Sequence, residues 1–378
     1  MKRLLTCTLF SATLLGLLLL SATASGGAVP AADSPTAPPE VRIAGTQSLH
    51  LTSAILGAEF NLYVNLPREY QDSTKLLPVI YLIDGQWDFP LLNAIFGQQY
   101  YDGYVPGVIV VGIAWGGENP NFDSLRARDL TPTPMGQASF TGNAPKFLQF
   151  IKTEVIPFVD AHYRTDRSDR TLMGSSLGGL FTLYALFEET SLFNRYVLTS
   201  PAIGWDGGVI STYEKNYTHD KSGRPVRLFM AVGGMEGNAP AFEKFAADLK
   251  EKKLEGLEME TRVIEGIGHS GGKAEGYTRG LQFVFAKPEL KLAPEILDRY
   301  AGWYEVGPGV KAQIVRDEDK LTALLPDGSK ITMFAQSETD FYMKGVYLVV
   351  HFKVGEKGKV TGFQLEQYTG RQFVKRVE

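Results

Sequence analysis

The stretch Thr171-Leu-Met-Gly-Ser-Ser-Leu-Gly-Gly-Leu-Phe181 decides the fold. It contains the pattern G-x-S-x-G between a short apolar run and a helical pattern. Small residues around the serine allow the sharp strand-to-helix turn that presents a nucleophile at the edge of a sheet. The register assigns this role to Ser176, because centring the motif on Ser175 would put two large side chains where glycines belong. The alternative is a Gly/Ser loop that only connects a strand to a helix.

Apolar runs on both sides of this turn predict a parallel sheet. Two early strands are expected at 51–56 and 60–66, followed by continuous apolar runs that are typical of strands buried on both faces. Strand and helix patterns then alternate, which predicts a doubly wound, mostly parallel sheet with its chemistry at the carboxyl ends of the strands. The predicted strands are 78–83, 105–114, 171–174, 195–199, 226–232 and 259–264, and the predicted helices are 146–162, 177–187, 241–254 and 274–285.

The pattern changes after Pro288 to short β-rich runs separated by turn signals such as Asp327-Gly328 and Thr369-Gly370. These runs predict a small all-β antiparallel C-terminal domain, folded as an open barrel or a curved sheet. They lie at 313–316, 321–325, 330–334, 346–354, 360–366 and 372–377.

The N-terminus resembles an export signal. Lys2 and Arg3 precede an apolar stretch at 4–20, and Ala22-Thr-Ala24 fits a cleavage site. A transmembrane helix is the alternative. We therefore expect a signal peptide (1–24), a linker (25–45), a catalytic domain (46–288) and the β domain (289–378), and a periplasmic or secreted protein without stable membrane insertion after signal cleavage.

Composition excludes several classes of protein. The 378 residues are 44% hydrophobic and carry a formal net charge of −4, with 38 basic and 42 acidic residues. That balance does not favour a disordered chain or a nucleic-acid partner. The single cysteine, Cys7, lies in the predicted signal, so the mature chain would have no disulfide and no cysteine-ligated metal. We expect no metal and no cofactor.

A serine nucleophile requires a general base, and the best candidate is His269. In this architecture the base follows the serine, and His269 follows the last predicted strand of the sheet. His50 and His162 come too early, His219 precedes the strand that should deliver the acid, and His351 lies in the β domain, where a structural role is expected. The loop Gly266–Gly271 also matches a dinucleotide motif, but at the wrong end of the sheet.

The acid of the triad should follow the strand at 226–232, and Glu236 is the first acidic residue there. A carboxylate at this point would orient the imidazole of His269 and stabilise its charged form. The alternative is a charge placed favourably before the next helix.

Two backbone amides are predicted to form an oxyanion hole. The amide of Leu177 directly follows the nucleophile, and the amide of Gln86 follows an earlier strand in the turn that contains Gly85. The assignment of Gln86 rests on the order of the segments alone.

These motifs together resemble the putative-esterase family of the α/β-hydrolases, which includes esterase D, siderophore esterases, feruloyl esterases and mycolyltransferases. The resemblance covers about residues 49–286 and is carried by the motifs at 81–86, 174–179, 200–202, 234–236 and 268–269. It implies a triad of Ser176, Glu236 and His269 and an oxyanion amide at Gln86.

The resemblance extends to the stretch 126–132, which is similar to a loop beside the cleft in siderophore esterases. Arg126 and Arg128 could hold an anionic group of the substrate there, or they could brace the loop.

Trp87 and Phe89 are candidates for an aromatic wall, although burial in the core is an equal alternative for Phe89. The run after Ser200-Pro201 departs from the family pattern, and the β domain is similar to one appended to some secreted hydrolases.

The sequence thus predicts an exported serine carboxylic-ester hydrolase that acts on a small-molecule ester through an acyl-enzyme. A siderophore esterase acting on catecholate trilactones is the alternative. A non-catalytic binding protein that uses the C-terminal domain is the alternative from another class.

Overall fold

The computed structural model describes residues 41–71, 74–136, 139–218 and 224–377. Its first part is an eight-stranded sheet in the order β1-β2-β4-β3-β5-β6-β7-β8. The strands from β4 to β8 pair in parallel, and β2 pairs antiparallel with both β1 and β4. The predicted doubly wound, mostly parallel sheet is therefore confirmed. The strands are β1 (Thr46–Ser53), β2 (Ala58–Asn65), β3 (Leu77–Leu82), β4 (Ile109–Trp115), β5 (Thr165–Ser175), β6 (Arg195–Thr199), β7 (Val226–Gly233) and β8 (Leu257–Ile264).

The apolar run of β3 is buried on both sides of the sheet. Val79 and Tyr81 belong to one core, whereas Ile80 and Leu82 belong to the other. Successive side chains of a strand point to opposite faces, so a continuous apolar run is stable only where helices cover both faces.

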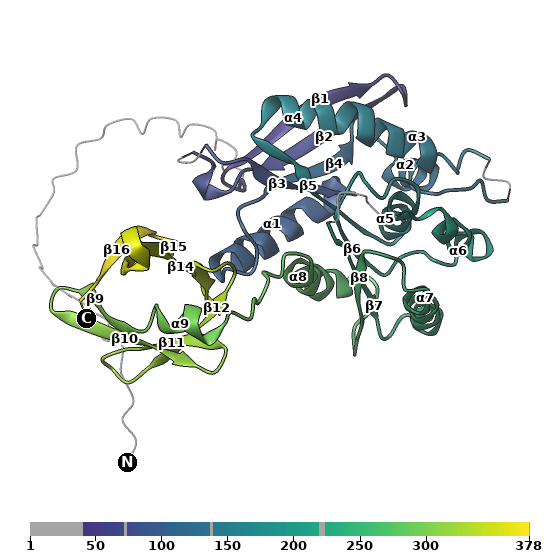
Figure 1. The fold of residues 1–378 in the computed structure, drawn as a ribbon. Helices are drawn as coiled ribbons and strands as arrows, with labels where there is room; N and C mark the ends of the chain where they lie inside the picture. The colour runs from purple at the N-terminus through teal and green to yellow at the C-terminus, as the bar shows by residue number, and fades with distance from the viewer. Residues whose placement is uncertain (1–40, 72–73, 137–138, 219–223, 378) are drawn as a thin grey trace, which may run out of the picture. The chain divides into compact units, whose positions relative to one another are not determined.

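Two sets of helices cover these faces (Figure 1). One core is completed by α1 (Gly85–Tyr101) and α8 (Gly272–Val284). The other is completed by α3 (Ala144–Phe150), η2 (Ile151–Val155), α4 (Ile156–His162), α5 (Leu177–Glu188) and α7 (Ala239–Glu251). The remaining helices are η1 (Arg68–Tyr70), α2 (Phe122–Asp129), η3 (Trp205–Gly208), α6 (Ile210–Tyr213), η4 (Glu214–Asn216), α9 (Pro294–Asp298) and η5 (Glu356–Gly358).

The C-terminal strands form an antiparallel barrel in the order β10-β11-β12-β13-β14-β15-β16-β9. The predicted all-β domain is confirmed, but the expectation of an open barrel or curved sheet is wrong. β9 pairs with both β10 and β16, which closes the barrel. The strands are β9 (Gly302–Gly307), β10 (Val310–Asp317), β11 (Lys320–Leu324), β12 (Lys330–Ala335), β13 (Asp340–Tyr342), β14 (Leu348–Val354), β15 (Val360–Gln367) and β16 (Gly370–Arg376).

Several element boundaries differ from the predicted ones. The first strand ends at Ser53 and not at residue 56, because Gly57 N–H and Leu56 N–H both donate to Ser53 in a turn. The predicted helix over 146–162 contains the π-helical turn η2. Pro157 lacks the N–H that would bond to the carbonyl of Thr153, and a wider turn accommodates this loss.

The sequence pattern does not predict α1 or α2. α1 contains Pro90 and two glycines, which disfavour a helix, but its buried face compensates for this low propensity. α2 occupies most of the stretch expected to be a loop around Arg126, so that expectation is wrong.

The predicted signal peptide (1–24) and most of the linker (25–45) lie outside the described residues. No helix within the described ranges is both long enough and apolar enough to cross a membrane.

Candidate active site

Ser176 lies between β5 and α5, where the chain turns sharply. Its φ of 58° and ψ of −118° are unusual for a residue other than glycine. Gly174 makes the turn possible, because a Cβ there would lie 2.4 Å from the carbonyl oxygen of Gly178. This is the strand–turn–helix context that the motif requires.

Three neighbouring strands lead into strained residues at this edge of the sheet. Asp84 follows β3 with a φ of 62°, Ser176 follows β5 with 58°, and Ser200 follows β6 with 44°. Non-glycine residues in this region cost on the order of 1–3 kcal/mol each and cluster at functional sites. The carboxyl edge of β3, β5 and β6 is therefore the candidate site.

Glu236 and His269 are brought together from the loops after β7 and β8. The Nδ1 atom of His269 lies 2.6 Å from Oε2 of Glu236. Gly233 permits this approach, because a Cβ there would lie 2.6 Å from the carbonyl oxygen of Ile267. That carbonyl also accepts the N–H of Met235 at 3.0 Å, which joins the two loops.

The Glu236 carboxylate is held by three donors. Oε1 accepts the Ser200 hydroxyl at 2.5 Å and the Gly233 N–H at 2.9 Å, while Oε2 faces His269. Burial alone would raise the pKa of Glu236, but the hydrogen bonds from Ser200, His269 and Gly233 outweigh it, so the pKa is lowered. A charge placed only to favour the following helix would not need these partners. Glu236 is thus an ionised acceptor for His269.

Ser176 and His269 lie at the same edge but share no hydrogen bond. Within the described part of the chain, the Ser176 hydroxyl has no side-chain partner, and Nε2 of His269 has none either. The Ser176 carbonyl accepts the N–H of Ala202 at 3.0 Å, so the short loop after β6 contacts both the nucleophile and, through Ser200, the acid.

The two predicted oxyanion amides lie at helix N-termini. Leu177 is the first residue of α5 and Gln86 the second residue of α1, where backbone N–H groups have no carbonyl partner within the helix. The side-chain amide of Gln86 adds a feature that sequence reasoning missed. Its Nε2 and Oε1 atoms are buried and have no hydrogen-bond partner among the described residues.

Arg126 and Arg128 both brace the structure. The Nε and Nη2 atoms of Arg126 donate to Asp84 at 2.6 and 2.9 Å. Arg128 makes the same bidentate contact with Asp129, at 2.8 Å for each bond, and Asp129 also accepts from Trp115. Two donors of each guanidinium are therefore already used. The partner of Arg126 lies 42 residues away, and no local signal in the sequence indicates it.

The two candidate aromatic residues have different environments. Phe89 is 5% exposed and belongs to the core, as its alternative interpretation predicts. Trp87 is 45% exposed, with Phe122 edge-on at 5.6 Å and the Arg126 guanidinium 5.2 Å from the ring centre.

Among the other histidines, His50 is an exposed residue of the edge strand β1. His351 lies 2.7 Å from Asp340 in the barrel, which fits the expected structural role. His162 stacks on Phe158, and His219 lies outside the described residues. The loop at Gly266–Gly271 follows the edge strand β8, which is not the position of a dinucleotide site. Among the described residues, no group of three His, Cys, Asp or Glu is placed to hold a metal ion.

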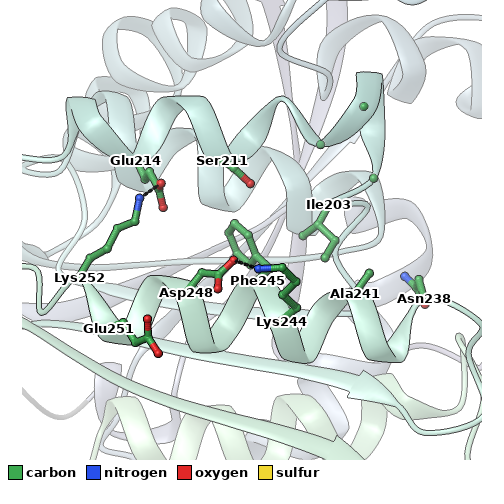
Figure 2. A pocket seen from close by; sticks show the side chains of 13 residues that line it. Ile203, Ser211, Glu214, Asn238, Ala241, Lys244, Phe245, Asp248, Glu251 and Lys252 are labelled. Atoms are coloured by element: carbon green, nitrogen blue, oxygen red, sulfur yellow. Dashed lines mark hydrogen bonds and ion pairs between the residues drawn. The ribbon is translucent and has the colours of Figure 1, made fainter.

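A cavity of about 780 Å³ lies between α6 and α7 (Figure 2). Ile203 and Phe245 form apolar walls of the cavity. The ion pairs Lys244–Asp248 and Lys252–Glu214 also line it. The described residues that line it include neither the serine, the glutamate nor the histidine of the candidate site. The cavity is therefore not the candidate site itself.

Comparison with known proteins identifies two segments. A sequence model of the family described as "Putative esterase" matches residues 53–253, which include Ser176 and Glu236, whereas His269 lies beyond the match. A model described as a domain of unknown function (DUF3471) matches residues 286–375.

Relatives of this chain include proteins named as siderophore esterases. Ferri-bacillibactin esterase BesA of Bacillus subtilis (strain 168) is 27% identical over 273 residues, covering 64% of this chain and 90% of the relative. The siderophore triacetylfusarinine C esterase of Aspergillus fumigatus is 29% identical over 196 residues, covering 49% of this chain and 66% of the relative. An IroE-like serine hydrolase from Shewanella oneidensis, 27% identical, matches with a TM-score of 0.56 over 64% of this chain and 80% of its own.

The family model covers more than half of the chain, and the relatives agree with it. The protein is a hydrolase with esterase activity. The chain belongs to the putative-esterase family of α/β-hydrolases and carries a β-barrel domain after the part that contains the eight-stranded sheet.

Proposed function

We propose that Ser176, Glu236 and His269 act as a catalytic triad in the hydrolysis of siderophore esters. The observation that carries this proposal is the 2.6 Å contact between His269 Nδ1 and Glu236 Oε2, at the sheet edge where Ser176 forms a strained turn. An imidazole held through Nδ1 has its Nε2 available to take a proton from the serine.

The reaction begins when Ser176 Oγ attacks the ester carbonyl carbon and its proton passes to His269 Nε2. The N–H groups of Gln86 and Leu177 stabilise the oxyanion of the tetrahedral intermediate. The bond to the alcohol then breaks, His269 returns the proton to the leaving oxygen, and an acyl-enzyme remains. Water attacks this ester with the same assistance and regenerates Ser176.

The hydrogen bond between Ser176 and His269 is expected to form in the complex with the ester. Catalytic hydrogen bonds often tighten only when substrate binds. The His269 side chain is 47% exposed, which supports access of a substrate to its free nitrogen.

The siderophore substrate is supported by the names of the relatives. One is named for ferri-bacillibactin and another for triacetylfusarinine C. The residues alone favour a general carboxylic-ester hydrolase, whereas the relatives give better support to a siderophore esterase. The exposed Trp87 lies next to Gln86 and is braced by Phe122 and Arg126. Such an indole is suited to stack on an aromatic ring of a catecholate siderophore.

The test compares rates on a catecholate trilactone and on simple aryl esters, together with labelling by a fluorophosphonate probe. We expect preference for the trilactone and labelling of the wild type. Ser176→Ala should abolish labelling and lower kcat by up to about 10⁶-fold. Comparable rates on both classes of ester would favour a general carboxylesterase, and a folded wild type that is not labelled would contradict the triad.

We also propose that the protein is exported. The support is the sequence pattern of Lys2, Arg3, the apolar stretch 4–20 and the small residues at 22–24. N-terminal sequencing of the protein recovered from the periplasm or the medium should begin at Ser25. Recovery of the chain only inside cells, with Met1 retained or residues 1–24 uncleaved, would contradict export.

A further inference from the structure

Ser200 is a buried residue that contacts the acid of the proposed triad. It follows β6 and is 1% exposed. Its hydroxyl donates to Oε1 of Glu236 at 2.5 Å, and the Gly233 N–H donates to the same oxygen at 2.9 Å. Both donors act on one carboxylate oxygen, so the other oxygen is left to face His269.

The orientation of this carboxylate depends on few contacts. A carboxylate can rotate about its bond to Cγ, and donors to one of its oxygens keep the other oxygen facing the imidazole. Hydrogen bonds to charged groups are roughly twice as strong as neutral ones. The Ser200 hydroxyl is the side-chain donor to Oε1, and at 2.5 Å it is the shorter of the two bonds to that oxygen.

The backbone of Ser200 is strained in a way that serves this contact. Its φ is 44°, a region in which glycine would be favoured. Its N–H donates to the Ala231 carbonyl at 2.7 Å, which fixes the residue between β6 and β7. Glycine would adopt this φ without strain but has no hydroxyl. A role for the hydroxyl explains why a serine occupies the position.

We propose that Ser200 is a positioning residue that holds Glu236 in the orientation in which it orients His269. This inference rests on the proposed triad. Ser200 itself does not contact the reacting atoms; it acts through the carboxylate.

Two substitutions separate the hydroxyl from the backbone. Ser200→Ala removes the hydroxyl and keeps the strain, whereas Ser200→Gly removes both. We expect kcat on a chromogenic aryl ester to fall about 10- to 100-fold in both variants, with KM nearly unchanged, because a charge-assisted hydrogen bond is lost. If the residue mattered only for the backbone, Ser200→Gly would keep the wild-type kcat, and that result would overturn the proposal.

Thermal unfolding of each variant separates a loss of function from a loss of fold. Glycine relieves the strained φ, so Ser200→Gly is expected to fold even where the alanine variant does not. A folded glycine variant with lowered kcat supports the proposal.

A double-mutant cycle with Glu236→Gln tests whether Ser200 acts through the acid. Adding Ser200→Ala to Glu236→Gln should cause no further loss of kcat, because the group that Ser200 positions is already altered. Additive losses would overturn the inference. If Glu236→Gln lowers kcat and Ser200→Ala does not, only the inference fails. If Glu236→Gln has no effect, the proposed triad fails and the inference fails with it.

Discussion

The Lys273 ammonium lies 2.7 Å from Oδ1 of Asp88 and joins the first turn of α8 to the first turn of α1. The other oxygen of Asp88 accepts the Tyr277 hydroxyl at 2.8 Å. Lys273 follows His269 by four residues, and Asp88 follows Gln86 by two. The ion pair therefore connects the loop of the proposed base to the turn of the proposed oxyanion amide.

Replacing Lys273 by methionine should destabilise the protein strongly. The Asp88 side chain is 4% exposed, and the substitution would leave its charge buried without a cation. We expect the free energy of unfolding, measured in urea, to fall by about 3 kcal/mol. Lys244→Met is the matched control, because it breaks a pair of 2.6 Å whose side chains are 75% and 53% exposed. Little change is expected there, and equal losses in both variants would contradict this account.

Arg126→Met tests whether Arg126 holds Asp84 in the turn that precedes the proposed oxyanion amide of Gln86. The Asp84 side chain is 1% exposed and would lose its guanidinium partner. We expect a loss of about 3 kcal/mol in unfolding free energy. Adding Asp84→Asn should restore part of it, since no buried charge remains. A raised KM with unchanged stability would instead indicate that Arg126 binds substrate.

The same variant should show a distinctive pH dependence. Burial raises the pKa of Asp84, and Arg126 offsets this effect only in part, so removing Arg126 raises the pKa further. A carboxyl whose folded pKa exceeds its unfolded pKa binds its proton better in the folded state, so it favours folding at low pH and opposes it as the pH rises. The difference in unfolding free energy between the wild type and Arg126→Met is therefore expected to shrink as the pH is lowered from neutral toward the ordinary pKa of aspartate. Urea midpoints across that range measure it, and a deficit independent of pH would contradict the explanation.

The sheet could be predicted from the sequence because its strands are buried on both faces. The run 78–83 is continuously apolar, and the structure divides its side chains between two cores. α1 could not be predicted in the same way. Pro90 and Gly97 weaken its helical signal, and its stability comes from packing against strands that only the folded sheet brings together.

The sequence also predicts the candidate catalytic residues and their order along the chain. It does not predict the residues that hold the site in place. Ser176, Glu236 and His269 follow from local motifs and from the strands that precede them. The contacts of Ser200 with Glu236 and of Arg126 with Asp84 join residues 36 and 42 positions apart. Each depends on which strands are neighbours in the sheet, and sequence spacing does not contain that information.

Gln86→Leu should raise the stability of the protein. The buried side-chain amide of Gln86 lacks a partner within the described residues, and such a group costs free energy in the folded state. Leucine of similar size should raise the unfolding free energy by about 1 kcal/mol. If the side-chain amide of Gln86 binds the ester, the substitution should also raise KM for the ester. Gln99→Leu on the same helix is the control, because Gln99 accepts a 2.8 Å hydrogen bond from Gln282, and its substitution should lower stability. Stabilisation of both variants would contradict the argument.

Gly233→Ala should separate the proposed acid from the proposed base. A Cβ at Gly233 would lie 2.6 Å from the Ile267 carbonyl oxygen and 3.0 Å from Oε1 of Glu236, so the loop that carries His269 must move. A displacement of about 1 Å at such a site can cost on the order of a hundredfold in rate, and we expect a loss of kcat of that size. Gly237→Ala is the matched control, because, apart from Gly237 and its two neighbours in the chain, no described residue has an atom within 4 Å of the added Cβ. Gly237→Ala should keep wild-type kinetics; if Gly233→Ala does so too, the contact between the two loops does not set the geometry of Glu236 and His269.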